Sequence, residues 1–150
     1  MKNLLAFALL FTALFSTGCD TENEPPFNTE IGYTGTLSMI SIDDPSKTYA
    51  FDHVSFDLKN ADDGTLTMLI HNMQFPGMPM AIDMIFPGIG FRSTEGGVTL
   101  SAPELIPYYG SRPMDERKVT DLQGTATGNR LTLSFVCMNY NVSYIGTKTN

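Results

Sequence analysis

One alternating run near the C-terminus constrains the fold of this chain more than any other feature. Its apolar side chains fall on every second position: Leu131, Leu133, Phe135 and Cys137. Thr132 and Ser134 lie between them, so the period of two predicts a β-strand with one buried face. Gly128-Asn129 comes just before, and both residues tolerate the positive φ of a tight hairpin turn. A strand entered through a hairpin is therefore expected here.

The strand that ends the chain needs a partner. Val142, Tyr144 and Gly146 continue the alternation after a second corner at Asn139–Asn141. The similar run Tyr33–Ile42 is the best candidate, because closing a sheet on itself removes its exposed edges. We therefore predict an all-β fold, a single antiparallel up-and-down barrel of about eight strands, with an open sandwich as the alternative.

The N-terminus carries the layout of a bacterial export signal. A basic start at Lys2 precedes the apolar run Leu4–Phe15, which at about twelve residues is too short to span a bilayer. Leu14–Cys19 resembles a lipobox, the cleavage motif of bacterial lipoproteins, although Ser16 stands where Leu is usual. The resemblance implies cleavage of residues 1–18 and lipidation of Cys19. An ordinary secretory signal is the alternative.

An acidic, proline-containing segment follows the cysteine. Residues 19–29 offer little apolar surface to bury and are expected to form a flexible tether to the barrel domain, residues 30–150. The lipobox resemblance implies a bacterial cell envelope protein, anchored in the outer membrane by its lipid. The acidic run also resembles the address that sends some lipoproteins to the outer surface, but a solvated linker explains it equally well.

The acidic charge of the chain argues against nucleic-acid binding, and its cysteine count argues against an internal disulfide. Without Lys2 the chain has 8 basic and 16 acidic residues, a formal net charge of −8. No cluster of Lys or Arg is present, so nucleic acid would be repelled. If Cys19 is lipidated, Cys137 has no partner for a disulfide and is expected to be a small buried hydrophobic residue.

The remaining strands follow one another through short turns. The apolar phase slips at Met39-Ile40, which predicts either a bulge or a strand end there. It slips again between Phe51 and Val54, as is typical of a sharply coiled barrel strand. No segment of the mature chain has a capped helical stripe. The stretch Ala102–Arg117 is the one long connection, and its apolar side chains predict either a plug over a barrel end or a gate.

The terminal strands carry a family resemblance. Tyr33–Leu37, Gly124–Leu133 and Val142–Thr147 look like the calycin-like (lipocalin-like) barrel domains of small bacterial lipoproteins. These motifs are structural, so the resemblance implies a fold and no catalytic residue. The chain has no Trp and therefore lacks the Gly-x-Trp signature of true lipocalins.

No enzymatic signature was found, and we expect neither an enzyme nor a cofactor. Gly-x-Ser-x-Gly, a phosphate-binding loop and His-Glu-x-x-His are all missing. The two histidines, His53 and His71, would form a metal site only if both met a carboxylate such as Asp52 or Asp83. Nothing in their spacing requires that, so no metal site is predicted.

Methionine is the unusual component, with nine in the chain. Methionine adapts to irregular gaps and to varied apolar ligands. A cavity for a small hydrophobic ligand would be lined by residues assigned to the interior, with two loop tyrosines at its mouth: Met68, Met80, Met84, Phe86, Phe135, Tyr108 and Tyr109. The alternative is a filled barrel whose outer surface contacts another envelope protein or a glycan, with an exposed apolar patch that includes the two tyrosines.

Overall fold

The computed structural model describes residue 27 and residues 30–149. The predicted signal segment, Cys19 and all of the tether except Phe27 lie outside the described residues. Within the described part, no helix has the length and apolar character needed to cross a membrane. Its only helix is the single 3-10 turn Asp115–Arg117.

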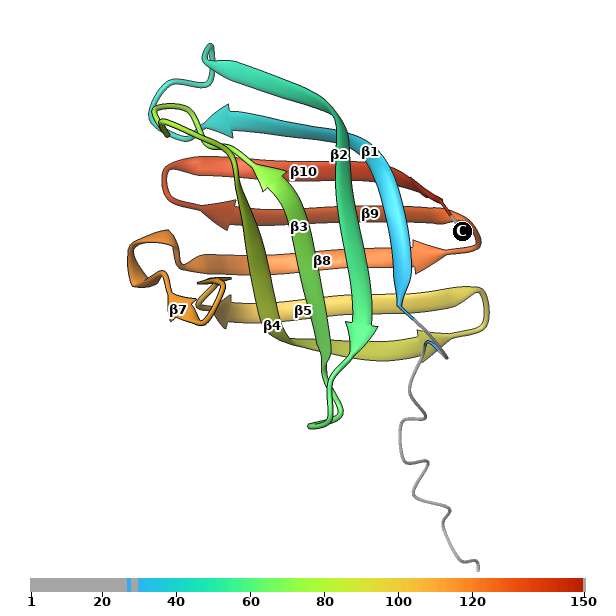
Figure 1. Ribbon diagram of the computed structural model, residues 1–150. Coiled ribbons are helices and arrows are strands. Elements are labelled where there is room, and N and C mark those ends of the chain that lie inside the picture. The colour runs from blue at the N-terminus through green and yellow to red at the C-terminus, as the bar shows by residue number, and fades with distance from the viewer. Residues whose placement is uncertain (1–26, 28–29, 150) are drawn as a thin grey trace, which may run out of the picture.

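Eight long strands and one short hairpin build the domain (Figure 1). The barrel strands are β1 (Ile31–Ser41), β2 (Thr48–Asn60), β3 (Leu66–Met73), β4 (Ile82–Thr94), β5 (Gly97–Leu105), β8 (Val119–Thr127), β9 (Arg130–Cys137) and β10 (Tyr140–Lys148), and the hairpin is β6 (Tyr108–Tyr109) with β7 (Arg112–Pro113). Each barrel strand pairs antiparallel with the next along the chain, and β10 pairs back with β1. The predicted all-β, closed, up-and-down barrel is confirmed.

The first and last strands close the ring, as the sequence predicted. Their register runs from Tyr33 opposite Lys148 to Ser41 opposite Tyr140. Gly35 faces Gly146 at this seam, and a Cβ at Gly35 would lie 2.0 Å from the backbone oxygen of Ile145. The two strands can therefore approach this closely only because position 35 has no side chain.

Four bulges bend the barrel strands, and each contains a residue with positive φ. An extra residue in one strand of a pair falls at His53 in β2, Asn72 in β3, Gly88 in β4 and Asp121 in β8. Such insertions increase local coiling, which a small barrel requires. The predicted phase change in β2 is confirmed.

The slip at Met39-Ile40 reflects the end of β1 at Ser41, one of the two predicted explanations, and not a bulge. Met39 is fully buried, whereas Ile40 and Ile42 are both more than two-fifths exposed, so the inward positions keep one parity to the end of β1. The bulge that bends the β1–β2 pair belongs to β2 alone. The two isoleucines are apolar residues that face outward.

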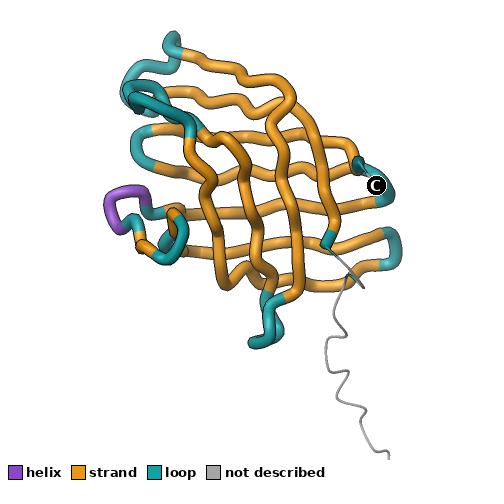
Figure 2. Tube along the Cα trace, viewed as in Figure 1, coloured by secondary structure: helices purple, strands orange, loops and turns teal. Residues whose placement is uncertain are grey.

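The two ends of the barrel differ in their connections. At one end, here called the turn end, lie the start of β1, the loop 61–65 and the tight turns 95–96 and 128–129. The opposite loop end carries segments 42–47, 74–81, 106–118 and the turn 138–139. Figure 2 shows the longer loops and the helix gathered at the loop end.

Candidate binding surfaces

Four of the predicted ligand-binding residues meet inside the barrel. Met68, Met84 and Phe86 have no exposed surface, and Phe135 has almost none. The rings of Phe86 and Phe135 touch edge to face, with centroids 5.4 Å apart. Side chains that contact one another in this way fill the space that a ligand would need.

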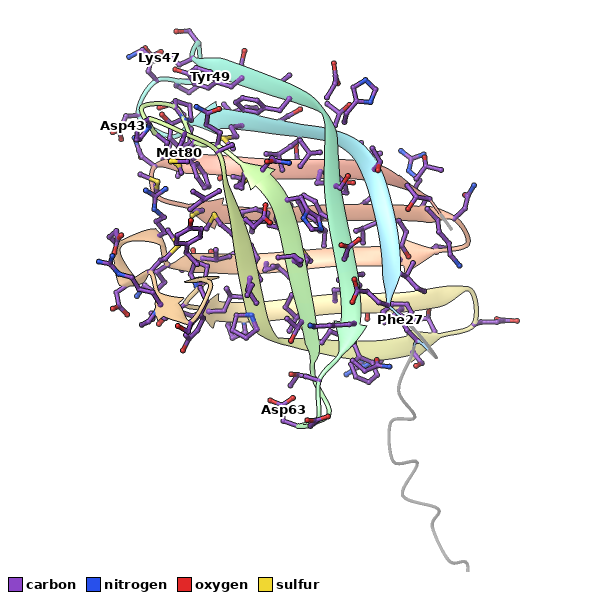
Figure 3. The ribbon with its side chains drawn as sticks, in the orientation of Figure 1. Phe27, Asp43, Lys47, Tyr49, Asp63 and Met80 are labelled. Atoms are coloured by element: carbon purple, nitrogen blue, oxygen red, sulfur yellow. The ribbon has the colours of Figure 1, made fainter. Side chains whose placement is uncertain are left out.

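Met80 does not join them. Its side chain is 62% exposed, because β4 begins at Ile82 and Met80 belongs to the preceding loop. The inward parity predicted for Met80 is therefore wrong. Figure 3 shows it at the loop end, on the same side of the molecule as Asp43 and Tyr49.

Two loops cover the loop end of the barrel. Phe75 of segment 74–81 is fully buried, and its N–H donates to Met78 Sδ over 3.2 Å. Arg117 reaches the same sulfur from segment 106–118, with Nη1 2.7 Å away. Met114 is buried beside them, and its N–H donates to the Pro107 carbonyl. We call this group of contacts the end cap.

The stretch expected to be irregular, 102–117, is more regular than predicted. It contains the end of β5, the β6–β7 hairpin and the 3-10 turn. Tyr108 pairs with Ile85 of β4 and is half-buried, whereas Tyr109 is 52% exposed. Because Leu105 and Met114 are buried, the segment closes the loop end, which favours the plug over the gate.

Cys137 lies beneath the end cap. Its thiol is buried and donates to the Arg117 carbonyl over 3.3 Å. Burial raises the pKa of the Cys137 thiol to about 12, although the charge of Arg117 acts in the opposite direction. A thiol in this state is unreactive at neutral pH, so Cys137 packs as the small hydrophobic residue expected from the sequence.

Exposed apolar side chains gather around the loop end. Among the described residues, five of the six exposed large hydrophobic side chains belong to this end: Ile40, Ile42, Met80, Tyr109 and Met138. The Ile42 N–H donates to the Asn139 carbonyl, which ties the end of β1 to the turn that holds Met138. We call these five residues the apolar rim.

A shallow groove of about 650 Å³ runs over the outside of the barrel, and the sequence reading missed it. Strands β5, β8, β9 and β10 supply its lining: Thr99, Leu100, Ser101, Gln123, Gly124, Thr125, Thr132, Leu133, Ser134, Ser143, Tyr144 and Ile145. A second hollow of about 300 Å³ shares Gln123 and Ser134 with it and extends to Asp121 and Asn141. The sequence feature that could have indicated this groove is the repeated Ser and Thr at the outward positions of its four strands.

His71 is the histidine with acidic partners. Its Nε2 lies 2.6 Å from Asp57 Oδ2, and its Nδ1 lies 3.6 Å from Asp83 Oδ2. The hydrogen bond with Asp57 raises the pKa of His71, and the charges of both carboxylates act in the same direction, whereas partial burial lowers it. No group of three or more His, Cys, Asp or Glu in the described part of the chain is arranged to hold a metal ion.

Comparisons of this chain with protein-family models, with curated proteins and with solved structures gave no match.

Proposed function

We propose that this chain is a non-enzymatic lipoprotein of the bacterial envelope, with a calycin-like barrel that acts as an interaction module. The apolar rim at the loop end is the surface that contacts an envelope protein partner. The observation that carries the proposal is the position of the rim. The chain enters the barrel at the turn end, where β1 begins, and the rim residues lie at the opposite end.

The filled interior supports a role for the outer surface. The residues that would line a ligand cavity, Met68, Met84, Phe86 and Phe135, are buried against one another, and none of the first three lines either outer hollow. A small hydrophobic ligand would have to displace these side chains or the end cap. An exposed cluster of apolar residues, in contrast, is a common feature of protein contact sites.

The direction of the chain also supports the rim. A lipid on Cys19 would hold the membrane on the side from which the chain enters β1, the turn end. The loop end would then face away from that membrane and be free to meet a partner. The three longest loops of the barrel lie at this end, and binding residues commonly sit on loops supported by a rigid scaffold.

The anchor has a direct test. In cells of a Gram-negative host, the full-length chain should fractionate with the outer membrane, and the Cys19→Ser variant should lose both the lipid and the membrane fraction. A Cys137→Ser variant serves as the control, since it removes the other cysteine of the chain. If Cys19→Ser still fractionates with the membrane, the lipoprotein assignment is wrong.

The rim can be tested by photo-crosslinking in the native host. A photoreactive phenylalanine analogue placed at Tyr109 should give one dominant crosslinked protein, and the same analogue at Glu95, on the turn end, should not. Met80→Lys should weaken the crosslink at position 109, because it places a charge within the rim. Equal crosslinking from both positions, or none from position 109, would overturn the proposed contact surface.

A further inference from the structure

We propose that the groove on the outer face of β5, β8, β9 and β10 binds an uncharged polysaccharide chain. The groove lies on the barrel wall and none of its lining residues belongs to the rim, so this proposal does not depend on the partner protein. It rests on four side chains that the strand register brings into one line: Ser101, Gln123, Ser134 and Ser143, here called the polar row.

Register places the polar row straight across four strands. Ser101 of β5 lies opposite Gln123 of β8, Gln123 lies opposite Ser134 of β9, and Ser134 lies opposite Ser143 of β10. All four residues are exposed. Neighbouring strands are about 4.8 Å apart, so hydroxyl and amide groups recur at a spacing close to that of the rings in a β-linked sugar chain.

The hydrogen-bonding groups of the polar row are free to bind. In the described part of the chain, none of the four side chains hydrogen-bonds to another protein group. A parallel line of threonines beside it is already engaged, since Thr125 and Thr132 share a 2.8 Å bond and Thr99 donates to the Arg92 carbonyl. Hydroxyls and amides both donate and accept, which matches the hydroxyls of a sugar.

The charge of the groove selects a neutral ligand. None of its twelve lining residues is charged, although the chain as a whole has a net charge of −7. A phosphorylated or uronic-acid-containing polymer would meet the negative field of the protein with no basic residue in the groove to offset it. A neutral chain has no such cost.

One apolar side chain completes the surface. Ile145 is 51% exposed in the groove and offers a contact for the C–H face of a sugar ring. The second hollow continues the site along β8, β9 and β10 beyond Ser134, where the bulge at Asp121 bends β8. Together the two hollows form an elongated, shallow site, which suits a chain better than a compact molecule.

The test is affinity electrophoresis of the full-length chain, purified from bacterial membranes in mild detergent. Native gels should contain a neutral glucan, mannan, galactan or soluble chitin derivative, or polygalacturonate as the acidic polymer. At least one neutral gel should retard the protein, and polygalacturonate should not. Gln123→Ala should weaken binding about three- to tenfold, the loss of one or two hydrogen bonds.

Two arginine variants locate the site. Ser134→Arg fills the centre of the groove and should reduce retardation at least tenfold. Thr147→Arg places the same charge on the exposed outer face of β10, outside the groove, and should bind as the unchanged protein does. The proposal is overturned if every neutral gel leaves migration unchanged, if polygalacturonate retards the protein, or if both arginine variants behave alike.

Discussion

At the scale of single residues, the seam between β1 and β10 leaves no room for a side chain at position 35. Gly35 and Gly146 face each other there, and the ring of Tyr144 lies over Gly146. The same ring stacks on Phe56 with centroids 3.9 Å apart. Small residues at a strand contact thus leave room for an aromatic ring that covers them.

Replacing Gly35 by Ala should destabilise the protein. The new Cβ would lie 2.0 Å from the Ile145 carbonyl oxygen, and backbone must shift to relieve the overlap. We expect a loss of about 1–3 kcal/mol in the free energy of unfolding, measured by chemical denaturation. Gly96→Ala is the matched control, because its Cβ would have no neighbour closer than 3.7 Å, and a similar loss in both variants would contradict the seam.

His71 gives the barrel a pH-dependent contribution to stability. The folded pKa of His71 is raised by its hydrogen bond with Asp57, so the protonated form stabilises the folded state. This contribution is complete below the unfolded pKa of about 6.5 and is lost as pH rises through the raised folded pKa. The unfolding midpoint of the unchanged protein should exceed that of His71→Gln at pH 5.5 by more than at pH 9.

The control for that experiment is His53→Asn, because His53 has no acidic partner among the described residues. Asn also tolerates the positive φ at this position. A difference between the unchanged protein and His71→Gln that stays constant across the pH range would contradict the ion pair.

At the scale of elements, one buried hydrogen bond links β10 to β2, the two strands that flank β1. Tyr144 Oη donates to the Val54 carbonyl of β2 over 3.1 Å, and burial raises the pKa of Tyr144 so that it remains a donor. Tyr144→Phe should cost about 0.5–1.5 kcal/mol of stability. Tyr109→Phe, at an exposed ring, should change stability by less than about 0.5 kcal/mol, and equal effects would refute the role of this bond.

The end cap can be followed through the thiol beneath it. With a pKa of about 12, Cys137 should label with maleimide very slowly at pH 8, because about one thiol in ten thousand is ionised. Met114→Ser removes a buried side chain of the cap and should speed labelling of Cys137, located by peptide mass spectrometry. Met138→Ser, at an exposed methionine, should not. Fast labelling of the unchanged protein would mean that the cap is open.

The sequence predicted which segments form strands better than it predicted where each strand begins and ends. Alternation at Leu131–Cys137 placed that strand correctly, because its inward and outward residues differ clearly in polarity. Ile40 and Ile42 were misread as inward, since alternation assumes that apolar residues face the core, and a rim of exposed apolar residues violates that assumption. Met80 was misplaced because parity does not show where a strand begins.

The candidate surfaces depend on information that no single segment contains. Ser101 and Ser143 are far apart in sequence, and only the registers of three strand pairs bring them into one line. The rim likewise joins residues from four loops or strand ends. A sequence can suggest the polarity of each strand face, but the neighbours across strands follow from register and bulges.

At the scale of the whole molecule, the interior of the barrel is filled by its own side chains, and we propose that binding takes place on its outer surface. Native mass spectrometry of the full-length chain, extracted in detergent from the envelope of its own host, tests this most directly. Native and denatured masses should agree, because any lipid on Cys19 is covalent and stays in both spectra. If a small apolar molecule is present at one copy in the native spectrum and is lost on denaturation, the interior holds a ligand and the filled barrel is refuted.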